Sequence, residues 1–120
     1  MEPPLQELST LEKDLIGFLK AHDFYNKTIS CMFTIKIKPE KEKEWKENLH
    51  KVIPQIRKEE GCLNYEVSQD IQDPTTFGVY EKWADGPALE FHFKCAYTKE
   101  FLASFEHIVV DVKSNIMKPL

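Results

Sequence analysis

The sequence predicts an α+β fold in which the elements follow one another as β-α-β-β-α-β, preceded by one extra helix. Several short stretches alternate apolar and polar residues, which is typical of strands with one buried face. Other stretches repeat apolar residues at helical spacing, and Gly and Pro residues mark the boundaries between the two kinds. This order indicates the ferredoxin-like, split β-α-β arrangement: a four-stranded antiparallel sheet with helices on one face.

The N-terminal extension, residues 1–28, is predicted to contain one amphipathic helix. Residues 1–8 are rich in proline, and we expect them to be poorly ordered. Ser9 to Glu12 has the form of a capping box, so the helix should begin there and run to about Ala21. A short helix is unstable alone in water, so it should dock on its own domain, on a second subunit, or over a pocket as a lid. Its apolar stripe would consist of Leu11, Leu15, Phe18 and Leu19.

The main domain, residues 29–120, should begin with a strand from Ile29 to Lys38. One face of this strand would carry Cys31, Phe33, Ile35 and Ile37. Pro39 ends the strand and suits the first turn of a helix, and Pro54 should bend that helix. The buried stripe of the helix would be Trp45, Leu49, Val52, Ile53 and Ile56. We expect residues 57–60 to be solvated and Gly61 to form a left-handed cap.

A β-hairpin is predicted to follow and to form both the centre of the fold and one wall of any site. The turn should span Asp70 to Thr75, because it contains Asp73-Pro74. The buried face of the first hairpin strand would carry Leu63, Tyr65 and Val67, and that of the return strand Phe77, Val79, Glu81 and Trp83.

The C-terminal part should supply two more helices and the last strand. Asp85-Gly86-Pro87 breaks the chain before a short helix with Ala88, Leu89, His92 and Phe93 on one side. A further helix is predicted over about Thr98–His107, and a returning strand over about Val112–Lys118.

One face of this sheet would have no helices over it. It would carry residues such as Met32, Thr34, Gly78 and Tyr80, which are too mixed to form an ordinary solvent surface. A second copy of the chain could cover the face through two-fold symmetry, so we expect a homodimer.

Composition excludes several classes of protein. The length of 120 residues suits one domain, and the net charge of -4 argues against a nucleic-acid partner. No apolar run approaches the ~20 residues that span a membrane, and the N-terminus lacks the features of a signal peptide. Three widely spaced cysteines, Cys31, Cys62 and Cys95, indicate reduced thiols and a cytoplasmic location. No phosphate cradle, dinucleotide fingerprint, nucleophile elbow or metal cluster is present, so we expect no cofactor and no metal.

Several motifs occur in a fixed order between residues 29 and 118. They are Lys-Pro-Glu-Lys-Glu-Lys-Glu-Trp after the first strand, Glu-Glu-Gly-Cys-Leu-Asn-Tyr-Glu-Val from Glu59, Asp-Pro-Thr from Asp73, Tyr-Glu-Lys-Trp from Tyr80, Leu-Glu-Phe-His from Leu89, and a closing Phe101. Together they resemble the antibiotic biosynthesis monooxygenase (ABM) family. The resemblance implies a dimeric α/β barrel, and similar proteins include cofactor-free oxygenases of anthrones and quinols, haem-degrading enzymes, and a processing enzyme for a phosphorylated signalling molecule.

Two departures from the family pattern affect the expected chemistry. Members commonly carry a second histidine a few residues after the first, where this chain has Cys95-Ala96-Tyr97. The haem-degrading members use an asparagine on the first strand, and the stretch from Cys31 to Ile37 contains none. The second departure argues against haem.

His92 is the first candidate for a catalytic residue, because its helical spacing places it on the apolar side and it matches the family motif. An imidazole can take a proton from an acidic phenol or an activated carbon near neutral pH. Glu81 would point its carboxylate into the apolar face, where it is either partnered, for instance by His92, or acts as an acid or base. We expect Trp83, Tyr65, Phe33 and Phe77 to line a substrate pocket. Ordinary core packing is the alternative for His92 and the aromatic residues, and a position near the rim that reaches solvent is the alternative for Glu81. His22, His50 and His107 should be solvated.

The functional hypothesis is a cofactor-independent monooxygenase that uses a histidine base and reacts directly with dioxygen. Its substrate would be a small planar aromatic molecule, such as a quinol, an anthrone or a related polyketide. Two alternatives remain: a non-oxidative isomerase acting on a small signalling molecule, for which only Lys36, Lys82 and Lys94 could supply charge, and a non-catalytic binding or stress-response dimer.

Overall fold

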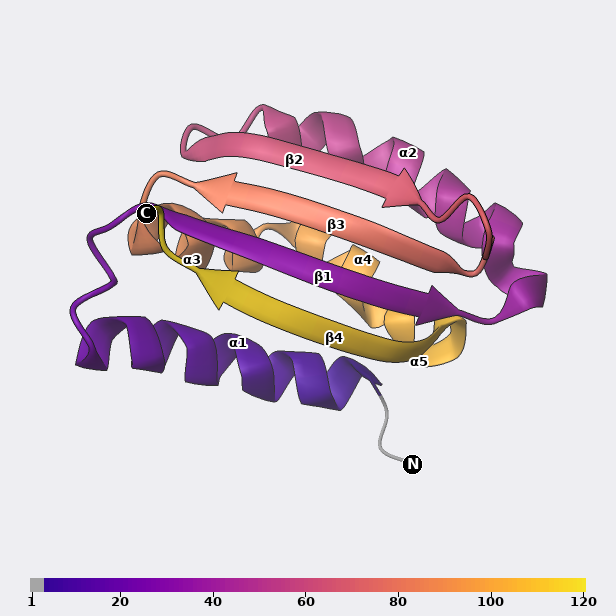
Figure 1. Ribbon diagram of the computed structural model, residues 1–120, viewed down its shortest axis with the longest axis horizontal. Coiled ribbons are helices and arrows are strands. Elements are labelled where there is room, and N and C mark those ends of the chain that lie inside the picture. Colours follow the sequence, from indigo (N-terminus) through magenta and orange to yellow (C-terminus); the bar gives the residue numbers. More distant parts are fainter. Residues whose placement is uncertain (1–3) are drawn as a thin grey trace.

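A computed structural model describes the backbone of residues 4–120 and the side chains of residues 13–120. It contains one four-stranded antiparallel sheet in the order β2-β3-β1-β4, with helices packed against it (Figure 1). The strands are β1 (Ile29–Ile37), β2 (Cys62–Gln69), β3 (Thr76–Trp83) and β4 (Val109–Met117). The helices are α1 (Pro4–Ala21), the 3-10 turn η1 (Pro39–Lys41), α2 (Glu42–Arg57), α3 (Gly86–Lys94), α4 (Ala96–Ala103) and α5 (Phe105–Ile108). The predicted α+β, ferredoxin-like order is confirmed.

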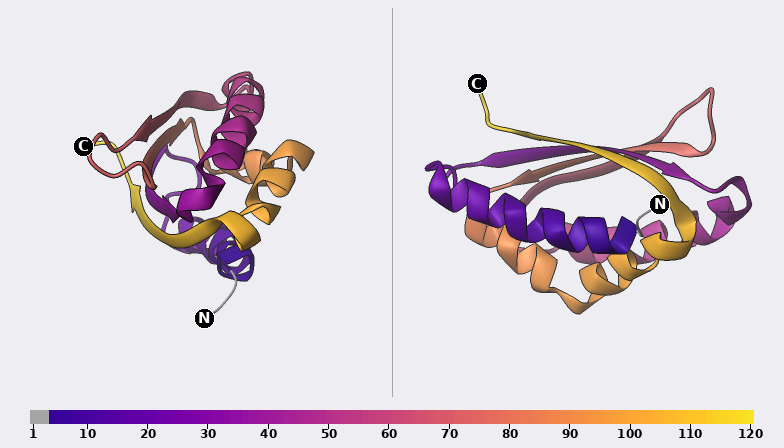
Figure 2. Two further views of the ribbon diagram at one scale, coloured as in Figure 1. Left: turned by 90° about the vertical axis from the view of Figure 1, so that its right-hand side faces the viewer. Right: turned by 90° about the horizontal axis from the view of Figure 1, so that it is seen from below.

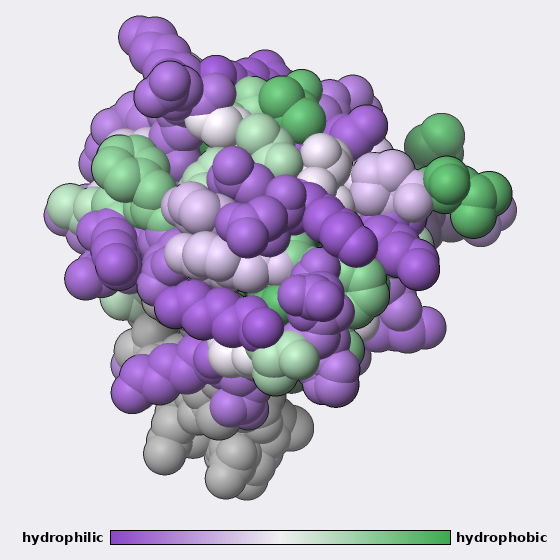
Figure 3. Space-filling view, turned by 90° about the vertical axis from the view of Figure 1, so that its left-hand side faces the viewer, coloured by the Kyte–Doolittle hydropathy of each residue, from purple (hydrophilic) through white to green (hydrophobic). Residues whose placement is uncertain are grey.

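The helices lie on one face of the sheet, and the opposite face is bare (Figure 2). Alternating residues of β1 and β3 point toward the helices, where they meet the buried stripe of α2. Trp45 is the centre of an aromatic group in this core, with its ring 5.8 Å from Phe77, 5.3 Å from Phe101 and 5.4 Å from Phe105. The end of the molecule that carries the C-terminus is mostly hydrophilic, with small, separate apolar patches (Figure 3).

Helix α1 differs from its prediction in its start and in its buried face. It ends at Ala21 as expected, but it begins at Pro4, so Ser9 to Glu12 lies inside the helix and the predicted cap there is wrong. Residues 1–3 and the side chain of Leu11 lie outside the described part. Phe18 is 52% exposed, whereas Ile16 is buried together with Leu15 and Leu19. This helix lies along the β4 edge and packs on α3, α4, α5 and β4. Because of this packing, the buried face of the helix is the one that carries Ile16 and not the one that carries Phe18.

Two positions at the start of β2 also correct the sequence analysis. Gly61 has no positive φ, so it is not a left-handed cap. A Cβ atom at Gly61 would lie 2.1 Å from Cβ of Ala88, so the glycine is required by close packing against α3. Leu63 lies where the β2–β3 register shifts, and it is 55% exposed instead of buried.

The predicted helix over Thr98–His107 is divided at Ser104 into α4 and α5, which together extend from Ala96 to Ile108. The last strand begins at Val109, directly after α5 and three residues earlier than expected from the sequence. Its residues Val112 and Ile116 pair with the inward-facing positions Ile35 and Cys31 of β1.

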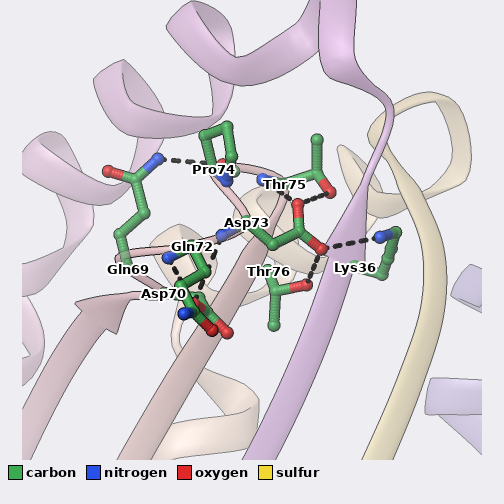
Figure 4. Close-up of polar contacts among 8 residues, drawn as sticks. All are labelled: Lys36, Gln69, Asp70, Gln72, Asp73, Pro74, Thr75 and Thr76. Atoms are coloured by element: carbon green, nitrogen blue, oxygen red, sulfur yellow. Dashed lines mark hydrogen bonds and ion pairs between the residues drawn. The ribbon is translucent and has the colours of Figure 1, made fainter.

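The hairpin turn between β2 and β3 is organised by Asp73 (Figure 4). Its Oδ1 accepts hydrogen bonds from the backbone N–H of Thr75 (3.0 Å) and from the Thr75 hydroxyl (2.6 Å). Its Oδ2 accepts from Thr76 and from Lys36 Nζ, both at 2.8 Å. The Lys36 contact and then the threonine donors hold the pKa of the Asp73 carboxyl well below its ordinary value. The predicted turn at residues 70–75 is confirmed.

Candidate active site

His92 projects from α3 toward the sheet and is buried. The helix begins after Asp85, whose carboxylate accepts a hydrogen bond from the backbone N–H of Ala88 at 2.9 Å, with Pro87 in the first turn. This start sets the rotation of α3, so that Leu89 and His92 share the inward face. The predicted direction of His92 is confirmed.

The partner of His92 is Glu59, which follows the end of α2. His92 Nδ1 lies 2.9 Å from Glu59 Oε2, and both side chains are buried. The same carboxylate oxygen accepts a hydrogen bond from the Tyr97 hydroxyl at 2.7 Å, while Thr98 Oγ1 lies 3.4 Å from His92 Nδ1. A carboxylate can only accept, so Nδ1 must donate to it. In the neutral imidazole, Nε2 then keeps the lone pair and is the nitrogen able to take a proton.

This contact corrects the expectation that residues 57–60 are solvated, because Glu59 is only 8% exposed. In the sequence, the charged run around Glu59 resembles an exposed helix end. The partners of Glu59 lie on α3 and α4, more than thirty residues further along the chain, so the run itself does not reveal them. The one available signal was Tyr97, a hydroxyl-bearing residue in the segment where relatives commonly have a second histidine. The second oxygen of Glu59, Oε1, is buried without a partner among the described side chains.

Glu81 is buried as expected, and its partner is Trp83 instead of His92. Alternate residues of a strand lie on the same face, and the Trp83 indole N–H donates to Glu81 Oε1 at 2.9 Å. Burial raises the pKa of Glu81, while the nearby His92 and the indole donor act in the opposite direction. The Trp83 ring packs on His92 with their centroids 4.5 Å apart.

A cavity of about 70 Å³ lies beside His92 and Glu81. Most of its wall is apolar. The sheet contributes Phe33, Ile35, Tyr65, Val79, Val112 and Ile116, and the helices contribute Leu15, Ile56, Phe93, Phe101, Leu102 and Phe105.

Four of the six predicted site residues line this cavity: His92, Glu81, Tyr65 and Phe33. The other two do not. Trp83 is fully buried behind His92, and Phe77 packs on Trp45 in the core. They lie at the two ends of the inward face of β3, and the cavity is lined by Val79 and Glu81 between them. The sequence shows which face of β3 is inward but not where along that face space remains.

Tyr65 is the third polar group at the cavity. It is buried on β2, and its ring centroid lies 6.4 Å from that of His92. Burial raises the pKa of its phenol well above the ordinary value, so the hydroxyl remains protonated and can donate a hydrogen bond.

The remaining reactive side chains lie apart from this cavity. His22, His50 and His107 are exposed as expected, and His107 Nε2 lies 2.8 Å from Glu44 on α2. All three cysteines are free, with only Cys31 buried. Across the described side chains, no group of three or more His, Cys, Asp or Glu residues could hold a metal ion. None of the described helices is both long and apolar enough to cross a membrane.

The antibiotic biosynthesis monooxygenase family model matches residues 28–110. The chain belongs to this family. A Bacillus subtilis (strain 168) protein named "Putative monooxygenase YcnE" is 32% identical over 75 residues, which cover 62% of this chain and 79% of that protein. The crystal structure of PA3566 from Pseudomonas aeruginosa has a TM-score of 0.74 at 27% identity and covers 80% of this chain and 97% of its own. A conserved Methanosarcina mazei Go1 protein has a TM-score of 0.70 at 26% identity, covering 81% and 97%.

Proposed function

We propose that this ABM protein is a cofactor-independent monooxygenase that oxidises a small planar aromatic molecule, such as a quinol or an anthrone, with His92 as its base. The observation that carries the proposal is the buried imidazole beside an apolar cavity, with Nδ1 held by Glu59 and Nε2 left as the acceptor. A carboxylate that fixes the tautomer of a histidine in this way stabilises the imidazolium formed when the ring takes a proton.

The proposed reaction needs no electron carrier besides the substrate. His92 Nε2 removes a proton from the acidic O–H or C–H group of the substrate, and the resulting anion is electron-rich. This anion passes one electron to dioxygen, and the substrate radical and superoxide combine to a peroxide. Return of the proton from His92 and loss of water, which takes the second hydrogen of the reacting carbon, convert a CH₂ group and O₂ into a carbonyl and H₂O.

The other cavity residues would assist this chemistry. Phe33 and the apolar wall exclude water and contact the ring face. The Tyr65 hydroxyl, and Glu81 when neutral, can donate hydrogen bonds to the developing oxyanion. Trp83 and Phe77 are placed behind this wall, where Trp83 supports both His92 and Glu81.

The alternative isomerase on a phosphorylated compound has less support. No Lys or Arg side chain is part of the cavity wall formed by the described residues. Lys36 is paired with Asp73 at the hairpin turn, and Lys94 is highly exposed near Glu90. A phosphate group would therefore find no cation in the cavity.

The direct test is oxygen uptake by the purified protein with quinols and anthrones, in the presence of a chelator. We expect uptake above the uncatalysed rate and a loss of about 10²–10⁴-fold in His92→Ala, since a positioned base contributes about this factor. His50→Ala, which changes an exposed histidine, is the matched control. No uptake above background would exclude this function and leave a binding protein without turnover. An undiminished rate in His92→Ala would exclude His92 as the base.

A further inference from the structure

We propose that Leu15 of α1 sets the size of the aromatic ligand that the cavity beside His92 accepts, and that α1 is the wall that moves to admit it. This inference rests on the proposed function only in taking the cavity as the ligand site. It concerns a helix outside residues 28–110, the part that the family model matches.

The cavity is too small for its proposed ligand in the conformation seen here. It holds about 70 Å³. An engineered apolar cavity of about 150 Å³ is known to accept benzene. A molecule of two or three fused rings therefore requires that at least one wall moves outward, since protein cores do not compress to make room.

Most of the cavity wall is held by polar contacts as well as by packing. The strands are joined by antiparallel hydrogen-bond ladders. The end of α2 is tied to β2 by Arg57 Nε, which donates to the Tyr65 carbonyl at 3.0 Å. Glu59 joins α3 and α4 through its contacts to His92 and Tyr97. Moving any of these elements would break hydrogen bonds that are buried or partly buried.

Helix α1 is attached differently along its length. Its described contacts with the domain come from the apolar side chains of Leu15, Ile16 and Leu19, and no hydrogen bond or ion pair of the described side chains joins residues 13–21 to the sheet or to another helix. Just beyond its C-terminal end, the chain is pinned to α3. The Gly86 N–H donates to the Tyr25 carbonyl at 2.6 Å, and the Tyr25 hydroxyl donates to Glu90.

This asymmetry allows α1 to pivot about the pinned segment. The helix lies on the helical side of the sheet at the β4 edge, with its N-terminal end directed away from that segment (Figures 1 and 2). Leu15 is the one described α1 residue in the cavity wall, opposite the strands that carry Tyr65 and Glu81. A shift of α1 would therefore move Leu15 out of the cavity while the groups around His92 stay in place.

The test compares a one-ring and a two-ring probe, phenol and 1-naphthol, by anaerobic calorimetric titration of the full chain. In Leu15→Ala we expect the ratio of the 1-naphthol Kd to the phenol Kd to fall about tenfold, a change within the range that apolar groups in a pocket produce. In Leu15→Phe the ratio should rise by a similar factor. Leu49→Ala removes the same atoms from a buried position on α2 outside the cavity, so its ratio should stay within about twofold of the wild-type value.

The inference would be overturned if the ratio of the two Kd values changed by less than about twofold in both Leu15 variants. It would also be overturned if Leu49→Ala changed the ratio as much as Leu15→Ala, or if neither probe bound to the wild type or to any variant. If Leu15→Ala does not fold, Leu15→Val should give a smaller shift in the same direction, and its absence would count equally. The titration needs neither oxygen nor turnover. Oxygen uptake that depends on His92 without a Leu15 effect would refute this inference alone, and the reverse result would refute only the proposed function.

Discussion

The carboxylate of Glu59 determines which nitrogen of His92 can act as a base. It accepts from Nδ1 of the imidazole and from the Tyr97 hydroxyl through the same oxygen, so ring and carboxylate are both fixed in orientation. A base held in one tautomer and one rotamer does not need to be ordered during the reaction. The tyrosine hydroxyl supplies a donor to this carboxylate from the segment where relatives commonly have a second histidine.

Glu59→Gln should lower the rate of oxygen uptake by about 10–100-fold, because the amide can present its NH₂ group to Nδ1 and favour the wrong tautomer. Glu60→Gln is the matched control, because Glu60 is the adjacent exposed residue. Equal rates in the two variants would show that Glu59 has only a structural role.

Glu81 should make stability depend on pH in a direction opposite to most carboxylates. Burial raises its pKa, so the folded protein keeps this proton to a higher pH than the unfolded chain does. The contribution of Glu81 to the free energy of unfolding is therefore fully present below the ordinary glutamate pKa. It is lost as the pH rises through the pKa of Glu81 in the folded protein.

Glu81→Gln should remove the loss of stability that ionisation of Glu81 causes as the pH rises. We expect its free energy of unfolding to be higher than that of the wild type at pH 7, with a smaller difference at pH 4, because the amide oxygen can still accept from the Trp83 indole. Urea unfolding at the two pH values measures this. Glu66→Gln changes an exposed position of β2. Its difference in free energy of unfolding from the wild type should be the same at pH 7 and pH 4. A wild type more stable than Glu81→Gln at pH 7 would mean that the ionised carboxylate stabilises the fold.

At the scale of elements, the residue before β2 packs so closely on α3 that it leaves no room for a side chain. Gly61 lies against Ala88, and Ala84 N donates to the Gly61 carbonyl at 2.9 Å. This contact fixes the distance between the loop that carries Glu59 and the helix that carries His92.

Gly61→Ala should lower the free energy of unfolding by about 1–3 kcal/mol, as overpacking of a well-packed core does. It should also lower oxygen uptake, because α3 must move away from Glu59. Gly17→Ala is the matched control: Gly17 is exposed within α1 with no atom near its missing Cβ, so alanine should stabilise by about 0.5–1 kcal/mol. Denaturant titration of both variants checks the pair, and a neutral Gly61→Ala would show that α3 is not held at this distance.

Sequence patterns predicted the elements well because their signals are local. The alternation in β1 and β3 fixed which residues face the helices, and the Asp73 turn was recognisable from adjacent residues. The polar part of the site depends on contacts across the fold. Glu59 meets His92 and Tyr97 only after α2, α3 and α4 have packed. The sequence also does not distinguish a glycine that caps a helix from one that, like Gly61, allows two elements to pack closely.

The bare face of the sheet is the main feature of the whole molecule that a single chain leaves unexplained. Met32 is 46% exposed at the middle of β1, with Tyr80 of β3 and Asn115 of β4 as its cross-strand neighbours. Met117 is also exposed, on the same face as Asn115. Family membership supports the expectation that a second copy of the chain covers this face.

Met32→Lys should prevent that association, because a dimer would bury an unpaired ammonium group at its centre. Light scattering at micromolar concentration should report a particle of about twice the chain mass of 14.1 kDa for the wild type and of the single chain mass for the variant. Phe91→Lys changes an exposed apolar residue on the helical side and should leave the mass unchanged. A wild type that scatters as a single chain would contradict the homodimer expected from the sequence.

Strand β1 obtains its second neighbour only when the residues of β4 have been synthesised. Ser30 pairs with Met117, and two residues of the cavity wall, Val112 and Ile116, belong to that same final strand. A growing polypeptide on the ribosome thus carries a central strand with one open edge, the kind of edge that joins other chains. Synthesis of β4, rather than collapse of the earlier segments, closes both the sheet and the ligand cavity.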